Sequence, residues 1–200
     1  ALEPDLAGRF SRALFFTDEA HLAPRQALAI LSERLGRTDA TTGTVIDCRG
    51  LSARDALRDL RGVRGEMVLI RCPEIALSRP VRLLHPRMPL YVVPRGDGVF
   101  MLGATMIESD RRGVVTARSV LELLSAAYAL DPAFGEAEIL ELGADARPAF
   151  PDNLPRIGRV GERLYANGLY RHGYLLAPAV AVQLAEPEER RLLLGEQLAD

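Results

Sequence analysis

The sequence contains no lysine and no tryptophan, and it has only two cysteines and three histidines among 200 residues. Cys48 and Cys72 do not have the CxxC spacing of a redox pair or a zinc site. His21, His85 and His172 are also too scattered along the chain to share a metal ion. We therefore expect no metal site, and the simplest interpretation is a reduced, cytoplasmic protein.

Long apolar runs and clusters of one charge are missing as well. No run is long enough to cross a bilayer, and residues 1–5 lack the basic start of a signal peptide, so no membrane partner is expected. The 25 arginines are scattered among 27 acidic residues, which disfavours a nucleic-acid surface. A net charge of −2 and 48% hydrophobic residues are typical of a globular protein, with one domain or one large and one partial domain.

The common catalytic motifs are absent. The sequence has no GxSxG elbow, no phosphate-binding GxxxxGK[ST] loop and no dinucleotide-binding GxGxxG. The polar residues that remain suit a small carboxylate: Arg147 in a proline-flanked loop, Arg171 in a glycine-containing turn, and the tyrosines at 91, 170 and 174. Arginine binds a carboxylate bidentately, and a tyrosine hydroxyl adds a third bond. Without other information, the more frequent interpretations are a surface-loop arginine at Arg147, an ordinary strand aromatic at Tyr91 and a core side chain at Met106.

Periodicity and capping residues predict a largely antiparallel α+β fold with flanking helices. Helices are expected at 24–36, at 52–60 with Ser52 as cap, at 117–129 with Thr116 as cap, and at 174–186. Strands are expected at 44–48, 64–72, 81–85, 89–94, 99–105, 137–143 and 164–166. The turn at 94–98 predicts a hairpin, and 146–155 is expected to be a proline-rich loop. No strand–helix–strand alternation is present, which favours antiparallel pairing.

The stretch from Asn167 to Pro178 organises the rest of the chain. A short strand runs through a turn with Gly168 and Gly173 into an apolar helix, and such a corner directs backbone N–H groups and the helix dipole at an anion. Arg171 is the only cation between Arg163 and Arg190. A plain strand–turn–helix corner with a solvated arginine is the alternative.

Four sequence blocks carry a resemblance to a known family. They are Val45–Leu51, Tyr91–Arg95 with Gly103–Met106, Ala146–Pro148, and Gly168–Pro178. In order and spacing they resemble the C-terminal part of the flavin-dependent glycine oxidase and D-amino-acid oxidase-like family. The resemblance implies a remnant of an FAD-binding domain at 1–61, a substrate-binding domain at 62–150, and a flavin-facing turn with a C-terminal helix at 151–200.

The resemblance also implies roles for individual residues. Arg147 and Tyr91 would bind the substrate carboxylate, Met106 would line the pocket, and Arg171 would lie beside substrate and flavin. The residues implied at the non-covalent FAD are Gly50, Tyr170, Arg171, His172, Gly173, Tyr174 and Leu175. The implied reaction is hydride transfer from glycine or a similarly small amino acid to FAD, with peroxide as a product, in thiamine thiazole biosynthesis. No side-chain acid or base is expected, because positioning does most of the work.

The sequence departs from the family pattern in its flavin domain. It has no GxGxxG, and only residues 37–43 separate the first predicted helix from the first predicted strand, where the family has a further stretch of flavin domain. Two hypotheses follow: an FAD-dependent oxidase, or a non-catalytic substrate-domain module without its own FAD. Glycine, sarcosine and small D-amino acids all fit as substrates, and exposed sheet edges would favour a homo-oligomer.

Overall fold

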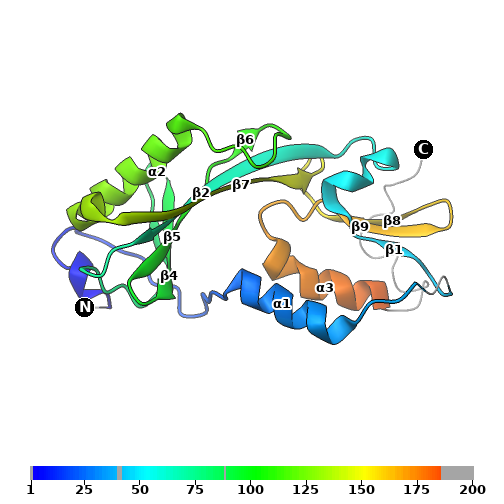
Figure 1. The fold of residues 1–200 in the computed structure, drawn as a ribbon, viewed down its shortest axis with the longest axis horizontal. Coiled ribbons are helices and arrows are strands. Elements are labelled where there is room, and N and C mark those ends of the chain that lie inside the picture. The colour runs from blue at the N-terminus through cyan, green and yellow to red at the C-terminus, as the bar shows by residue number, and fades with distance from the viewer. Residues whose placement is uncertain (1, 40–41, 88, 186–200) are drawn as a thin grey trace. The chain divides into compact units, whose positions relative to one another are not determined.

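The computed structural model describes residues 2–39, 42–87 and 89–185 (Figure 1). The chain forms two compact units, each built from separate segments. Unit 1 comprises Ala1–Asp39, Glu66–Thr105 and Gly113–Ala144; unit 2 comprises Ala40–Gly65, Met106–Arg112 and Asp145–Asp200. Two long paired strands, β2 (Arg61–Arg71) and β7 (Glu138–Ala149), contribute residues to both units. The three-region division expected from the sequence stays a prediction.

Unit 1 is an antiparallel sheet with a helix on one face. Its strands follow the spatial order β3 (Val81–Leu83), β4 (Leu90–Gly96), β5 (Val99–Gly103), β2. The predicted hairpin between β4 and β5 is confirmed. Its turn residues Asp97 and Gly98 have positive φ angles of 51° and 68°, which suit the tight turns that join antiparallel strands. The predicted α+β class with a largely antiparallel sheet is also confirmed.

The helix α2 (Ala117–Leu130) covers this sheet, as Figure 1 shows. Apolar residues recur every three or four positions along this helix, and the face that they form is buried in the core of unit 1. Thr116 caps the helix as predicted, because its hydroxyl oxygen accepts from the Ser119 amide. The carboxylate of Glu66, which is fully buried, accepts from the Thr116 amide at 2.8 Å. The core side chains are Val68, Ile70, Cys72, Ile75, Leu77, Leu90, Val92, Phe100, Leu102, Leu123, Ala126, Ala127, Leu130 and Phe134.

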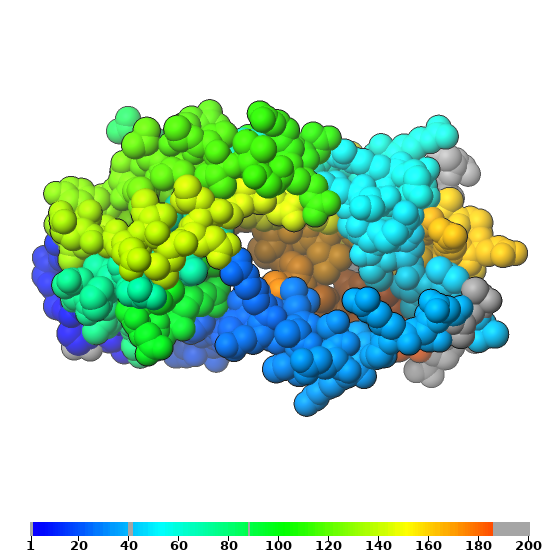
Figure 2. Space-filling model, in the orientation of Figure 1, coloured from blue at the N-terminus to red at the C-terminus, as the bar shows by residue number. Residues whose placement is uncertain are grey.

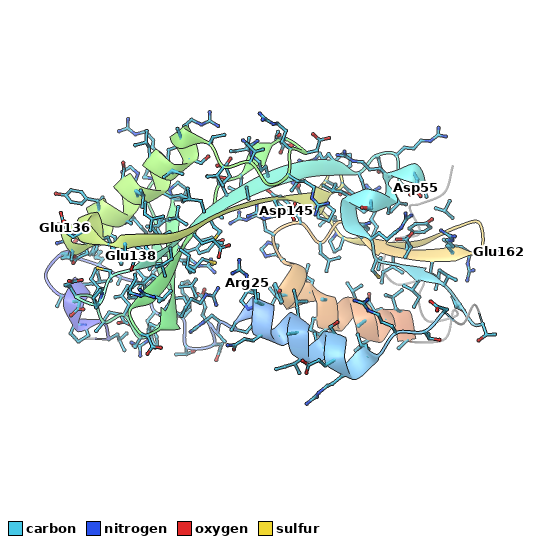
Figure 3. All side chains as sticks on the ribbon, in the orientation of Figure 1. Arg25, Asp55, Glu136, Glu138, Asp145 and Glu162 are labelled. Carbon is cyan, nitrogen blue, oxygen red and sulfur yellow. The ribbon has the colours of Figure 1, made fainter. Side chains whose placement is uncertain are left out.

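The helix α1 (Pro24–Leu35) confirms the first predicted helix, which Pro24 begins and Gly36 ends. A bidentate ion pair joins it to β7: Arg25 Nη1 and Nη2 lie 2.9 Å and 2.5 Å from the Glu141 carboxylate oxygens. Figure 3 labels Arg25. The hydrogen bond and the charge of Arg25 lower the pKa of Glu141 below its ordinary value of 4.5.

We expect this ion pair to give a pH dependence of defined sign. A carboxyl group with a depressed folded-state pKa stabilises the fold above its unfolded pKa, and the contribution is lost as the pH falls through the folded-state pKa. Glu141→Gln should therefore lower the melting temperature slightly above pH 4.5, and the difference from wild type should vanish in stronger acid. The effect is small because solvent screens an exposed pair. Melting curves from pH 3 to pH 7 measure it, and a constant difference across this range would contradict it.

Unit 2 contains a small mixed sheet. The strand β1 (Ile46–Asp47) pairs in parallel with β9 (Arg163–Asn167), which pairs antiparallel with β8 (Arg156–Val160). The turn between β8 and β9 lies at the surface of unit 2, in gold in Figure 2. The helix α3 (Gly173–Ala185) follows β9. A cluster of buried hydrophobic side chains in unit 2 consists of Ala53, Leu57, Leu60, Phe150 and Tyr165.

Two predictions about local structure are wrong. Ser52 does not cap an α-helix to residue 60, because Gly50–Asp55 forms a 3₁₀-helix (η2) that begins after Arg49. The predicted loop from 146 is not a loop at its start, because β7 extends through Ala149. Pro148 has no backbone N–H to donate, and its carbonyl accepts from the Tyr170 amide.

The structure also contains elements that the sequence did not predict. The sequence pattern did not predict β8, whose alternation Gly158 interrupts, nor the two-residue strand β6 (Ile107–Glu108), nor the 3₁₀-helices η1 (Pro4–Leu6) and η3 (Pro132–Glu136). The last predicted helix is confirmed as α3, and its expected end at Glu186 lies outside the described residues. Among the described residues, none of the helices combines the length and the hydrophobicity that crossing a bilayer requires.

Candidate functional site

The candidate site begins where two parallel strands of unit 2 end. The carboxyl ends of β1 and β9 meet at one edge of the small sheet, the usual place for a ligand beside parallel strands. Asn167, only 2% exposed, ties the two ends together. Its Nδ2 donates to the Gly50 carbonyl at 2.9 Å, and its Oδ1 accepts from the Gly168 amide at 2.8 Å. The turn after β1 and the turn after β9 are therefore one hydrogen-bonded structure.

Charged groups fix the turn after β1. Asp47 is buried and accepts from the backbone N–H and from Nε of Arg49, at 3.0 Å and 2.8 Å. The Arg49 Nη2 also lies 2.9 Å from Asp55, which is labelled in Figure 3. Hydrogen bonding from Arg49 lowers the pKa of the Asp55 carboxyl group. Two carboxylates thus hold the arginine just before Gly50, whose φ of 61° is in the region that favours glycine.

Gly168 allows the turn after β9 to lie close against the core. Its φ is 76°, and a Cβ added there would come closer than 3.0 Å to two ring atoms of Phe150. Phe150 is fully buried. The guanidinium of Arg156 lies 4.2 Å from the centre of the same ring and restricts its movement further. Gly168 is therefore required both by its conformation and by the space available.

Tyr170 connects this turn to two other segments. Its φ of 49° is unusual for a residue with a side chain, and its amide donates to the Pro148 carbonyl at 3.1 Å. Its hydroxyl donates to the Met106 sulfur, with Oη and Sδ 3.6 Å apart. The turn of residues 168–172 thus lies against β7 next to Arg147. Through the Tyr170 hydroxyl it also contacts Met106. Single residues from three of the four sequence blocks, Met106, Pro148 and Tyr170, therefore meet here within unit 2.

Arg147 lies on β7 with its guanidinium over Gly65 of β2. A Cβ built on Gly65 would come closer than 3.0 Å to Cζ and to both Nη atoms of Arg147. The side chain is half-buried rather than fully solvated. The surface-loop interpretation of this residue is therefore wrong, because it belongs to a strand and packs against a neighbouring strand.

The remaining predicted residues are placed as follows. Arg171 and His172 are exposed, and α3 begins directly after them at Gly173. Tyr91 belongs to unit 1, where its ring lies over Gly103 across the β4–β5 pair. The functional roles expected for these residues stay predictions.

The sequence interpretation missed several residues that build this site. The sequence pattern indicates Asn167 only as the start of a turn, and it assigns no role to Gly65 or Asp47. A signal was present for Gly65, because an isolated glycine inside a strand pattern often marks a close approach of another group. No comparable signal indicated the bond from Asn167 to Gly50, because the two are far apart in sequence.

The chain resembles known proteins in both sequence and structure. The sequence profile of DAO, the FAD dependent oxidoreductases, matches residues 29–186. The chain belongs to this family. A putative thiamine biosynthesis oxidoreductase ThiO of Rhizobium etli is 58% identical over 98% of the chain, and the match spans 62% of that protein. The glycine oxidase of Geobacillus kaustophilus is 31% identical over 94% of the chain and 53% of that protein.

Solved structures agree with this assignment. The crystal structure of the Geobacillus kaustophilus glycine oxidase has a TM-score of 0.62 and 29% identity, and covers 74% of this chain and 41% of that chain. The structure of an iminodiacetate oxidase from Chelativorans also has a TM-score of 0.62, at 26% identity, covering 73% and 42%. This DAO-family chain therefore spans between about half and two thirds of the length of these two curated relatives.

The residues after β9 fit one part of the family's cofactor. The Leu176 amide donates to the His172 carbonyl at 2.8 Å, so α3 starts at this turn, and the positive end of its dipole lies there. No acidic side chain lies in this first turn. Such a helix start suits the electron-rich pyrimidine edge of a flavin. The described residues include no glycine-rich phosphate cradle, so the fit extends to the ring and not to the pyrophosphate.

Proposed function

We propose that the protein containing this chain oxidatively deaminates glycine or a similarly small amino acid, with FAD as cofactor. The observation that carries the proposal is the hydrogen bond from Tyr170 to Pro148. This bond joins the turn of residues 168–172, for which we propose contact with the flavin, to the neighbour of Arg147, a residue type suited to bind a carboxylate. The names of the ThiO and glycine oxidase relatives support the same reaction class.

Each candidate residue has a defined task in this proposal. Arg147 binds the substrate carboxylate through two parallel N–H donors, and the hydroxyl of Tyr91 adds a third hydrogen bond. Met106 supplies an apolar wall, and the hydrogen bond from Tyr170 restrains its sulfur. Arg171 adds positive charge beside the carboxylate. The task of these groups is to hold the α-carbon in one orientation.

The chemistry needs little else from the side chains. When bound, FAD supplies the acceptor for the hydride that leaves the α-carbon. The amine enters in its neutral form, so no side-chain base is required. The overall balance is amino acid, water and dioxygen converted to a 2-oxo acid, ammonia and hydrogen peroxide. The start of α3, with the Gly50 and 170–175 backbone, favours negative charge on the adjacent ring edge.

The proposal is tested by adding FAD and then glycine to the purified protein. We expect a bound flavin spectrum that loses its visible absorbance with glycine in the absence of oxygen. In air, peroxide and glyoxylate should form in equal amounts. A protein that binds no FAD and forms no peroxide would contradict the proposal and support the alternative, a non-catalytic substrate-domain module.

We further infer a place in thiamine biosynthesis, which rests on the name of the Rhizobium etli relative. The gene should then restore growth without thiamine to a strain that lacks its own oxidoreductase for this step. Failure of a flavin-loaded, glycine-oxidising protein to restore growth would separate this inference from the reaction itself.

A further inference from the structure

We propose that Gly65 is a positioning residue for the carboxylate-binding arginine: its missing side chain leaves the space in which the Arg147 guanidinium lies. The inference rests on the proposed function, in which Arg147 binds the substrate carboxylate. The three heavy atoms nearest to a Cβ built on Gly65 are Cζ, Nη1 and Nη2 of Arg147. The group that fills the space is thus the whole charged end of the arginine.

The backbone gives no other reason for a glycine at this position. Gly65 lies within β2, and its φ is not among the positive values that favour glycine. Glycine in a strand interior weakens the strand, because it loses more conformational freedom and packs no side chain. What glycine offers at position 65 is therefore space, and Arg147 occupies that space.

A second candidate residue is accommodated in the same way. A Cβ on Gly103 would come closer than 3.0 Å to Cζ and Oη of Tyr91, so the phenol end of this tyrosine lies over a glycine. Gly103 also lacks a positive φ. The two side chains proposed to bind the carboxylate thus each have their polar end over a strand glycine. This repetition indicates a common way of placing the two groups.

Adding a methyl group at position 65 should affect the stability of the fold and the binding of substrate differently. The atoms that an alanine at 65 would overlap are the far end of a long, flexible side chain. The arginine can move away, so the fold should tolerate the change. The guanidinium would then lie elsewhere, and a displacement of about 1 Å in a bound group costs on the order of 100-fold in the most demanding cases.

The test measures glycine kinetics for Gly65→Ala in the FAD-loaded protein. We expect KM to rise on the order of 10-fold or more, with little change in kcat at saturation, because a binding group is displaced. The melting temperature should change little. Gly143→Ala is the matched control: Gly143 is also a strand glycine on the β2–β7 pair, and its Cβ would overlap the flexible end of Met67 rather than Arg147. This control should keep its KM.

A double-mutant cycle decides whether Gly65 acts through Arg147. In an Arg147→Ala background, Gly65→Ala should have no further effect on KM, because the displaced group is gone. A raised KM that persists in this background would overturn the inference. So would an unchanged KM for Gly65→Ala while Arg147→Ala alone raises it. If Arg147→Ala itself leaves KM unchanged, the proposed function fails, and the inference fails with it.

A readout without flavin adds an independent check. In NMR spectra, the Nε–Hε resonance of Arg147, assigned by its loss in Arg147→Ala, should shift when acetate is added. In Gly65→Ala the same resonance should start at a different position and should need a higher acetate concentration to shift. An unchanged resonance and an unchanged acetate response in Gly65→Ala would overturn the inference.

Discussion

We expect Arg147→Ala to raise the KM for glycine by roughly 30- to 700-fold. Removing one partner of a hydrogen-bonded charge pair costs about 2–4 kcal/mol when the pair is shielded from water, and 1.4 kcal/mol corresponds to a factor of ten. The side chain is half-buried over Gly65, so the bound carboxylate would be partly shielded. The carboxylate remains bound in the transition state, so most of the loss should appear in KM rather than kcat.

Two further variants make this result specific. Arg147→Lys keeps the charge but loses the planar pair of donors, so it should recover only part of the lost affinity. Arg118→Ala is the control for removing an arginine in general: Arg118 lies exposed on α2, 3.8 Å from Glu122. Its KM should equal that of wild type. Equal KM values for Arg147→Ala and wild type would contradict the proposed carboxylate site.

The sequence predicted the elements of unit 1 well because local patterns determine them. The apolar period of α2, the hydroxyl of Thr116 and the hairpin turn at Asp97 and Gly98 act over a few residues, and the structure confirms each. The short elements of unit 2 were predicted less well. β1 has two residues and pairs with β9, more than a hundred positions away, so no local pattern specifies the pairing.

The candidate site shows the same limit of local patterns. Residue types indicated Arg147, and the resemblance to the oxidase family added Met106 and implied a role for each. The contacts that place them could not be predicted, because each joins distant positions: Arg147 with Gly65, and Tyr170 with Pro148 and Met106. The arrangement of a site built from several distant segments therefore requires the three-dimensional structure.

Gly168→Ala should destabilise the fold by about 2–5 kcal/mol, the sum of a conformational cost and a steric one. A side chain at a left-handed position costs about 1–2 kcal/mol. The overlap with Phe150 adds about 1–3 kcal/mol, because a packed core relaxes only by strain. For a chain of this size 1 kcal/mol shifts the melting temperature by roughly 2–4 °C. The alanine should also weaken FAD binding, because it displaces the turn that precedes α3.

Gly161→Ala separates the two causes. Gly161 has a φ of 59°, and a Cβ there would meet nothing within 4 Å, so this variant carries the conformational cost alone. The excess loss in Gly168→Ala then measures the overlap with Phe150. Phe150→Leu provides the complementary test: it should destabilise wild type but relieve the overlap in Gly168→Ala, so the double variant should be more stable than the sum of the single losses predicts. Equal losses at 161 and 168 would mean that Phe150 moves freely and that the turn after β9 is not fixed by the core.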